Sequence, residues 1–185
     1  MTTILGISGS LRRGSFNSSL LRAAAELAPQ GASIEIASIR DIPLYDGDLE
    51  AESGIPEPVR ALKERIASAD GLLLVTPEYN NSIPGVLKNA IDWLSRPPAD
   101  SPRVFRDRPV ALMGATPGAG GTGMAQTAWL PVLRALNTRA WFGPRLMVSG
   151  ASKVFDAEGH LTDEGIKKQL TSFVAGFVEF TQHAR

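Results

Sequence analysis

One short apolar run limits the fold of this chain more than any other feature. Gly71 to Val75 is apolar throughout and lies between Asp70 and Thr76, so it is far too short to span a membrane and has no polar face. A strand without a polar face needs cover on both sides, which is typical of the interior strands of a parallel sheet. We therefore expect helices on both faces of a sheet with this run at its centre.

Further strand patterns alternate with helical ones along the chain. Apolar residues recur at helical spacing between the strands, most clearly from Ile83 to Leu94, where Ser82 is expected to cap the helix and Lys88 to pair with Asp92. This alternation predicts an α/β fold with a three-layer, doubly wound, five-stranded parallel sheet. The other predicted strands are Thr3 to Ser8, Ser33 to Ser38, Pro109 to Met113 and Trp141 to Val148.

The rest of the chain fits one domain. We expect a helix from Met124 to Leu136 only if Pro131 kinks it or lies in its first turn. A closing helix is expected from about Thr162. Asp41 to Pro58 is the one long irregular insert, and no repeat or linker divides the chain. We therefore expect residues 1–185 to form a single domain.

Composition excludes several chemistries. The chain has no cysteine, which excludes disulfides, thiolate metal sites, iron–sulfur clusters and catalytic thiols, so redox chemistry would need a bound cofactor. Lys plus Arg (19) balances Asp plus Glu (19), so no overall field attracts nucleic acid or an anionic membrane. Small molecules and other copies of the chain are the expected partners, no metal site is predicted, and the cytoplasm is the expected location.

The first of three polar loops, Ser8 to Ser18, lies between a strand and a helix. Its donors surround the positive end of the helix dipole and suit the terminal phosphate of a mononucleotide. An ordinary serine-rich loop with a capped helix is the alternative. The donors are the hydroxyls of Ser10, Ser15, Ser18 and Ser19, the amide of Asn17 and the guanidinium of Arg12 or Arg13.

The second loop, Pro77 to Ser82, follows the central apolar run. Tyr79 offers a flat face, and Asn80 and Asn81 can read the donor and acceptor edge of a planar heterocycle. Packing of Tyr79 on the core is an equally weighted alternative. Glu78 is more often a solvated or capping carboxylate than a general base.

The third loop runs from Gly114 to Gly123. Gly118, Gly120 and Gly123 match a GxGxxG pattern, but they follow the fourth strand, and the next acidic residue is Asp156. A dinucleotide site is therefore disfavoured. A flexible wall against a cofactor ring, or a plain turn, explains these glycines better.

Three motifs carry a family resemblance. They are Gly9-Ser10-Leu11-Arg12 with Ser15-Phe16-Asn17, Thr76-Pro77-Glu78-Tyr79-Asn80, and Pro84-Gly85 with Leu87-Lys88-Asn89-Ala90-Ile91-Asp92-Trp93-Leu94. The chain resembles the NADPH-dependent FMN reductase family of flavodoxin-like proteins, near its bacterial chromate and quinone reductase branch. The region Gly123 to Arg145 matches less well. The resemblance implies FMN with its phosphate on the first loop and its ring against the second, and homodimers or homotetramers that share the edge of the flavin site. The implied flavin contacts are Ser10, Arg12, Ser15, Phe16, Asn17, Ser18, Pro77, Glu78, Tyr79, Asn80, Asn81, Thr116 and Gly118.

The expected function is NAD(P)H-dependent reduction of quinones and similar small acceptors (chromate, azo or nitro compounds, free flavin) by ping-pong hydride transfer through FMN. No side chain is needed as acid or base, and His160 and His183 lie outside all three loops. A non-catalytic electron carrier or a flavin-binding regulator is the alternative. The choice between NADH and NADPH stays open, since surface arginines are usually only solvated. The arginines that a 2′-phosphate could contact are Arg12, Arg13, Arg103, Arg106 and Arg108.

Overall fold

A parallel sheet is the framework of the structure, a computed structural model that describes residues 1–183. The strands are β1 (Thr2–Ser8), β2 (Ala32–Ala37), β3 (Gly71–Val75), β4 (Pro109–Ala115), β5 (Arg139–Ala140) and β6 (Leu146–Val148). Their order is β2-β1-β3-β4-β5, and β6 also pairs with β4. Each of these pairs is parallel, so the carboxyl ends of the strands share one edge. This arrangement confirms the doubly wound, flavodoxin-like α/β fold.

The central position of the apolar run is also confirmed. β3 lies between β1 and β4, and each of its residues is buried. Helices on both faces provide the cover that such a strand needs.

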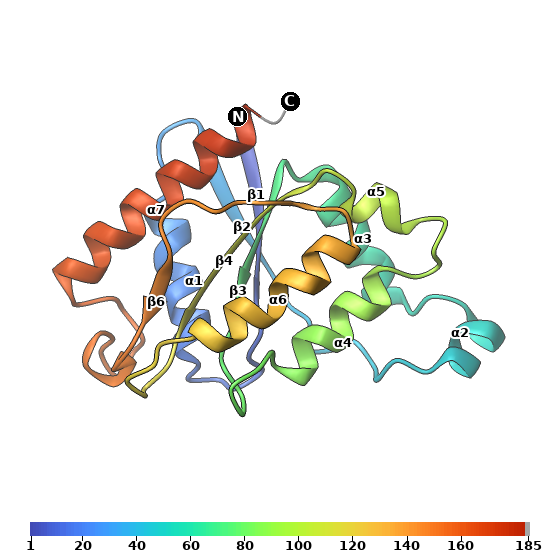
Figure 1. Cartoon of the computed structure of the whole chain (residues 1–185), viewed down its shortest axis with the longest axis horizontal. Helices are drawn as coiled ribbons and strands as arrows, with labels where there is room; N and C mark the ends of the chain where they lie inside the picture. Colours follow the sequence, from blue (N-terminus) through green and yellow to red (C-terminus); the bar gives the residue numbers. More distant parts are fainter. Residues whose placement is uncertain (184–185) are drawn as a thin grey trace.

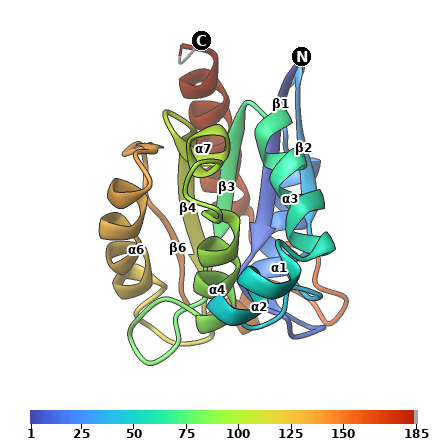
Figure 2. The same ribbon diagram turned by 90° about the vertical axis from the view of Figure 1, so that its right-hand side faces the viewer.

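Helices cover the two faces of the sheet in separate groups. They are α1 (Phe16–Glu26), α2 (Gly47–Ser53), α3 (Glu57–Ser68), α4 (Gly85–Leu94), α5 (Ser101–Phe105), α6 (Gly123–Ala135), a 3₁₀ turn (Ala151–Lys153) and α7 (Glu164–Gln182). Figure 1 shows α1 and α7 on one side of the sheet, with α3, α4 and α6 on the other. Figure 2 shows the second group in front of the strands, with α2 below. No helix within residues 1–183 is long and apolar enough to cross a membrane.

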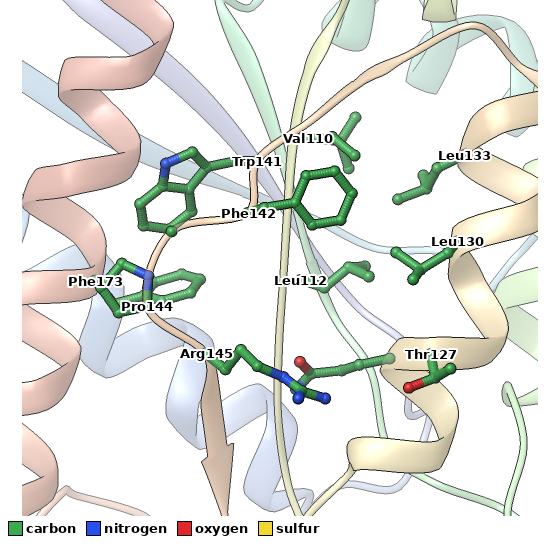
Figure 3. A pocket seen from close by; sticks show the side chains of 13 residues that line it. Val110, Leu112, Thr127, Leu130, Leu133, Trp141, Phe142, Pro144, Arg145 and Phe173 are labelled. Carbon is green, nitrogen blue, oxygen red and sulfur yellow. The ribbon is translucent and has the colours of Figure 1, made fainter.

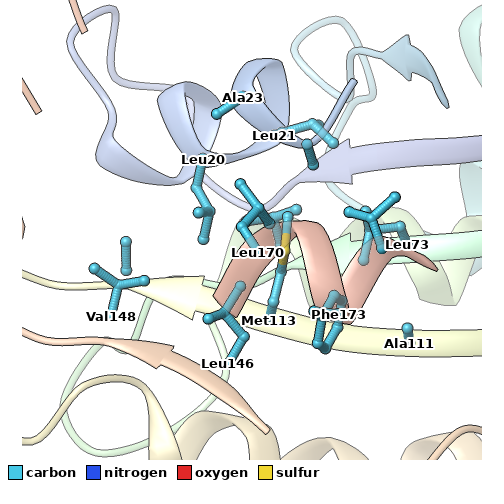
Figure 4. Packing of buried hydrophobic residues seen from close by; sticks show 14 of the residues in the cluster. Leu20, Leu21, Ala23, Leu73, Ala111, Met113, Leu146, Val148, Leu170 and Phe173 are labelled. Atoms are coloured by element: carbon cyan, nitrogen blue, oxygen red, sulfur yellow. The ribbon is translucent and has the colours of Figure 1, made fainter. Parts of the chain in front are cut away.

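Each face has its own buried core. Leu20 and Leu21 of α1 and Phe173 of α7 pack against Leu73 and Met113 of the sheet (Figure 4). On the opposite face, buried residues of α3, α4 and α6 pack against β1, β3 and β4; they include Val59, Ile66, Leu87, Trp93 and Trp129.

The fifth strand differs from the prediction. Trp141 to Val148 was expected to be one strand, but the chain leaves the sheet after Ala140 and returns at Leu146, so the sheet has six strands. A Cβ on Gly143 would lie 2.1 Å from the Trp141 ring, so the backbone bends closely around the indole. Pro144 has no N–H for a ladder hydrogen bond. The centre of the Trp141 ring lies 5.0 Å from the centre of the Phe173 ring. This packing therefore stabilises the chain more than a continuous strand through residues 141–145 would.

Several helix details also differ. α4 begins after Pro84 rather than after a Ser82 cap, whereas the Lys88–Asp92 pair is confirmed at 2.7 Å. α6 continues through Pro131, whose side chain is exposed. The insert predicted to be irregular contains α2, capped by the Asp46 carboxylate, which accepts from the Asp48 N–H.

Candidate functional site

Three loops meet at the carboxyl edge of the sheet. The first loop (residues 9–15) connects β1 to α1, the second (76–84) connects β3 to α4, and the third (116–122) connects β4 to α6. A Cβ on Gly9 would lie 3.0 Å from Pro77 and 3.2 Å from Pro84, so only glycine lets the first two loops approach this closely. The Tyr79 hydroxyl lies 3.5 Å from the Ser10 hydroxyl across the same contact.

Side-chain hydrogen bonds hold the two elements that flank the third loop, β4 and α6, close to the other two loops. The Asn17 amide donates to the Ala115 carbonyl and accepts from the Ala115 N–H, each at 2.9 Å. The Glu78 carboxylate accepts from the Ala125 N–H at 3.0 Å, in the first turn of α6. The capping interpretation of Glu78 fits this contact, and the predicted site residues of all three loops are brought together at one edge.

The first turn of α1 is arranged as an anion site. Ser15 caps the helix by accepting from the Ser18 N–H, while the N–H groups of Phe16 and Asn17 have no acceptor within residues 1–183. Free N–H groups at a helix N-terminus attract anions, and the helix dipole adds to that attraction. The Arg12 guanidinium lies 5.5 Å from the centre of the Phe16 ring, which holds a positive charge beside this turn.

A cavity of about 360 Å³ opens beside the first loop. Its wall includes three predicted phosphate contacts, Ser10, Arg12 and Ser18. The Ser18 hydroxyl donates to the Ser8 hydroxyl at 3.0 Å. Ser8 is therefore a further hydroxyl at this loop, beside those predicted from the sequence.

The second loop presents Tyr79 to solvent on a tight turn. Tyr79 and Ser82 exchange two backbone hydrogen bonds, at 3.2 and 3.0 Å. Between them Asn80 and Asn81 have φ values of 50° and 58°, the backbone of a type I′ turn, which asparagine tolerates well. The asparagines are thus explained by turn geometry, and Tyr79, 47% exposed, does not pack in the core.

The third loop is largely exposed. The Thr116 hydroxyl accepts from the Gly118 N–H at 3.3 Å, and residues 117–120 are exposed. Gly121 has a φ of 62°, and its Cβ position lies 2.9 Å from Met147, so a turn and a close approach explain this glycine. No hydrogen bond of Thr116 or Gly118 reaches the other two loops among residues 1–183.

The loop after β2 also reaches this edge, although it was not among the predicted site loops. Arg40 follows β2 at the same edge and donates to the Leu11 carbonyl, and Arg22 of α1 lies on the same cavity wall. The strand pattern of β2 could have indicated this loop, because every strand of a parallel sheet has its carboxyl end at this edge and β2 was predicted to be such a strand.

The insert after β2 is fixed against α4. The Pro43 carbonyl accepts from the Asn89 amide at 2.8 Å and from the Trp93 indole N–H at 3.0 Å. The Arg96 guanidinium donates to Glu50 and holds the pKa of that carboxyl below its usual value. The Tyr45 hydroxyl also donates to Glu50, a contact that raises the pKa of Tyr45. The insert thus forms a wall beside α4.

A second cavity, of about 380 Å³, lies away from these loops. Figure 3 shows it between α6, β4 and residues 141–145, with Leu130 and Phe142 on its wall and Arg145 beside it. None of the predicted site residues lines it. Its apolar wall therefore lies on a different part of the surface from the three loops.

The edge site fits FMN. The free N–H groups of α1, the hydroxyls and Arg12 match a phosphate dianion, and the exposed Tyr79 ring supplies a flat surface for a planar ring system. Among residues 1–183 the site brings together no cluster of side chains suited to acid–base catalysis. The arrangement suits binding, and chemistry there would come from a bound cofactor.

Comparisons with known proteins find relatives over nearly the whole chain. Residues 2–153 match the family model described as NADPH-dependent FMN reductase. An NAD(P)H-dependent FMN reductase of Pseudomonas aeruginosa is 49% identical over 90% of this chain and 88% of its own length. A quinone reductase of Escherichia coli is 39% identical over 98% of this chain and 96% of its own.

A solved structure is similar over the same range. The flavoenzyme NAD(P)H:(acceptor) oxidoreductase FerB of Paracoccus denitrificans superposes with a TM-score of 0.88 at 35% identity, covering 100% of this chain and 99% of that one. The chain belongs to the NADPH-dependent FMN reductase family, and is thus an oxidoreductase that uses FMN and NAD(P)H.

Proposed function

We propose that this protein uses NAD(P)H to reduce quinones at an FMN bound on the three loops. The observation that carries the proposal is the first turn of α1, where two free N–H groups follow the loop of Ser10 and Arg12, and the Arg12 guanidinium lies over the Phe16 ring. Relatives described as quinone reductase and 2-hydroxy-1,4-benzoquinone reductase support the acceptor class.

The residues of the chain bind and orient in this proposal. Phe16 and Asn17 donate backbone N–H groups to the phosphate, and the hydroxyls of Ser10 and Ser18 with the Arg12 guanidinium complete the binding. The Asn17 side chain also fixes α1 to β4, since its amide donates to the Ala115 carbonyl and accepts from the Ala115 N–H.

The second and third loops would surround the ring. Tyr79 supplies a flat wall, Pro77 and the turn at Asn80 and Asn81 shape the edge, and Thr116 and Gly118 form the opposite wall. Glu78 keeps the second and third loops together by accepting from Ala125. FMN, when bound, supplies the hydride acceptor and donor chemistry.

NAD(P)H and the acceptor would use the same open face in turn, which predicts ping-pong kinetics. An open face discriminates poorly by shape, so chromate, azo compounds, nitro compounds and free flavin belong to the proposed acceptor range. The cytoplasm, where NAD(P)H is available, is the proposed location.

The absorption spectrum of the purified protein tests the proposal. We expect flavin bands, their bleaching by NAD(P)H under nitrogen, and their return on addition of a quinone. Steady-state turnover separates an enzyme from the alternatives, because a carrier or a regulator would bind flavin without sustained NAD(P)H oxidation. A colourless protein that takes up no FMN would overturn the proposal.

Homo-oligomer formation is part of the proposal. The apolar cavity beside α6 is bordered by Phe142, 78% exposed, and Leu130, 39% exposed. Exposed apolar side chains grouped in this way favour a protein contact. Light scattering of Phe142→Glu against the unchanged protein tests it, since a charge on this surface should lower the mass in solution.

A further inference from the structure

Four arginines border the cavity beside the first loop, and no carboxylate among residues 1–183 neutralises any of them. They are Arg12, Arg13, Arg22 and Arg40. Four other arginines show the contrast, because Arg60, Arg65, Arg96 and Arg103 each contact a carboxylate. In a chain of zero formal net charge, this cavity is a local concentration of unpaired positive charge.

The contacts that these arginines make do not neutralise their positive charge. Arg12 lies over the Phe16 ring, Arg22 donates to the Ser19 hydroxyl at 3.0 Å, and Arg40 donates to the Leu11 carbonyl. Arg13 makes no ion pair or hydrogen bond within the described residues. Neutral acceptors and a ring do not cancel a guanidinium charge, so all four cations face the cavity with their charge intact.

The charge exceeds what one phosphate needs. A phosphate monoester carries about two negative charges at neutral pH. One such group at the first turn of α1 would leave about two positive charges of the four unbalanced. The surplus matches a second phosphate dianion.

The other arginines that a 2′-phosphate could contact are placed elsewhere. Arg103 is held by Asp100 and Glu64. Arg108 donates to the carbonyls of Val104 and Ala69, and Arg106 ends α5 just before β4 begins, at the opposite edge of the sheet from the loops.

The cavity lies on the β2 side of the first loop, whereas Tyr79 lies on the β3 side. The wall of the cavity includes Ile36 and Ile39, and Ser10 both lines the cavity and contacts Tyr79. A nicotinamide nucleotide whose ring lies near Tyr79 would cross Ser10 and place its distal, adenosine end in the cavity. The 2′-phosphate is the dianion that this end carries.

We propose that this cavity binds the 2′-phosphate of NADPH, with Arg13 and Arg40 as the residues that select NADPH over NADH. The proposal rests on the proposed function, and it adds a selectivity site that neither the family description nor the named relatives assign to residues.

Selectivity of the FMN-loaded enzyme is the first test. The ratio of kcat/KM for NADPH to kcat/KM for NADH should fall about tenfold in Arg13→Ala and in Arg40→Ala, the loss of one charge-assisted hydrogen bond. Arg134→Ala, an exposed arginine on α6, is the matched control and should leave the ratio unchanged. An unchanged ratio in both cavity variants, or an equal fall in the control, would overturn the proposal.

Binding without turnover is the second test. Adenosine 2′,5′-bisphosphate should bind the FMN-loaded protein about a hundredfold more tightly than 5′-AMP in calorimetry, and Arg13→Ala should reduce this preference about tenfold. Equal affinities would overturn the 2′-phosphate site, and so would loss of FMN from Arg13→Ala, since the cation would then belong to the flavin phosphate. Failure of the proposed function would give a different result from failure of the 2′-phosphate site, because the protein would then bind no FMN.

Discussion

The side chain of Asn17 makes both of its hydrogen bonds to a single residue, Ala115. Its Nδ2 donates to the carbonyl oxygen and its Oδ1 accepts from the N–H, each at 2.9 Å. Asn17 is in the first turn of α1 and Ala115 ends β4, so this pair fixes the anion-binding turn against the sheet. Both residues are buried, which makes an unsatisfied group there costly.

Asn17→Asp should destabilise the fold. The carboxylate cannot donate, and it would lie buried against the Ala115 carbonyl oxygen. We expect the free energy of unfolding to fall by about 2–4 kcal/mol in urea titrations. Asn81→Asp, on an exposed turn, is the control and should change it by less than about 0.5 kcal/mol. Equal stability of the two variants would show that the pair with Ala115 contributes little.

Arg12→Ala should weaken FMN binding without unfolding the protein. Its guanidinium is exposed, so its removal costs little stability, whereas the loss of a charge-assisted contact should raise the Kd for FMN about tenfold or more. Fluorescence titration of flavin-free protein measures this Kd. Unchanged affinity would remove Arg12 from the phosphate contacts.

FMN should bind more tightly than FAD. The free N–H groups of Phe16 and Asn17 suit a terminal dianion, and the pyrophosphate of FAD carries less charge per phosphate and a bulky adenosine. Competition of the two flavins for flavin-free protein measures the preference. Equal affinity for FMN and FAD would contradict the placement of the flavin phosphate at the first turn of α1.

Tyr79→Ala should alter acceptor kinetics more than thermal stability. Tyr79 is 47% exposed, so about half of its surface is already open to solvent on the turn. Tyr45→Ala is the matched control: that ring lies 4.9 Å from Trp93, and its loss should lower Tm with little effect on acceptor KM. The reverse pattern, with Tm falling mainly in Tyr79→Ala, would place Tyr79 outside the site.

Asp100→Asn should give a pH-dependent loss of stability. Hydrogen bonds from Arg103 and from the buried Lys63 lower the pKa of Asp100 to about 2. Because the folded-state pKa lies below the unfolded one, the carboxylate stabilises the fold above about pH 4, and this contribution is lost as the pH falls towards 2. At pH 7 we expect the variant to lose about 1–2 kcal/mol, with allowance for solvent screening of a partly exposed group.

Urea titrations from pH 7 to pH 3 measure this difference. It should narrow below about pH 4, where the unfolded carboxyl becomes protonated. Arg60→Ala removes an exposed ion pair with Glu57 and is the control, with little change at any pH. A constant difference between Asp100→Asn and the unchanged protein over this range would contradict the assigned pKa.

The sequence by itself determined the sheet and the position of the site. The run from Gly71 to Val75 has no polar face, so it had to lie inside the sheet, and parallel strands end at one edge whatever the details of packing. The three loops were therefore predictable, and so was the Lys88–Asp92 pair, because it depends only on neighbours within about one helix turn.

Only the tertiary structure decided which partner each side chain takes. Asn17 is committed to Ala115 and Glu78 to Ala125, and Arg40 joins the first loop from another strand. Residues 141–145 leave the sheet because the Trp141 indole packs on α7. These contacts join residues far apart in the chain, and local spacing holds no information about them because their geometry is set by how the sheet, helices and loops pack together.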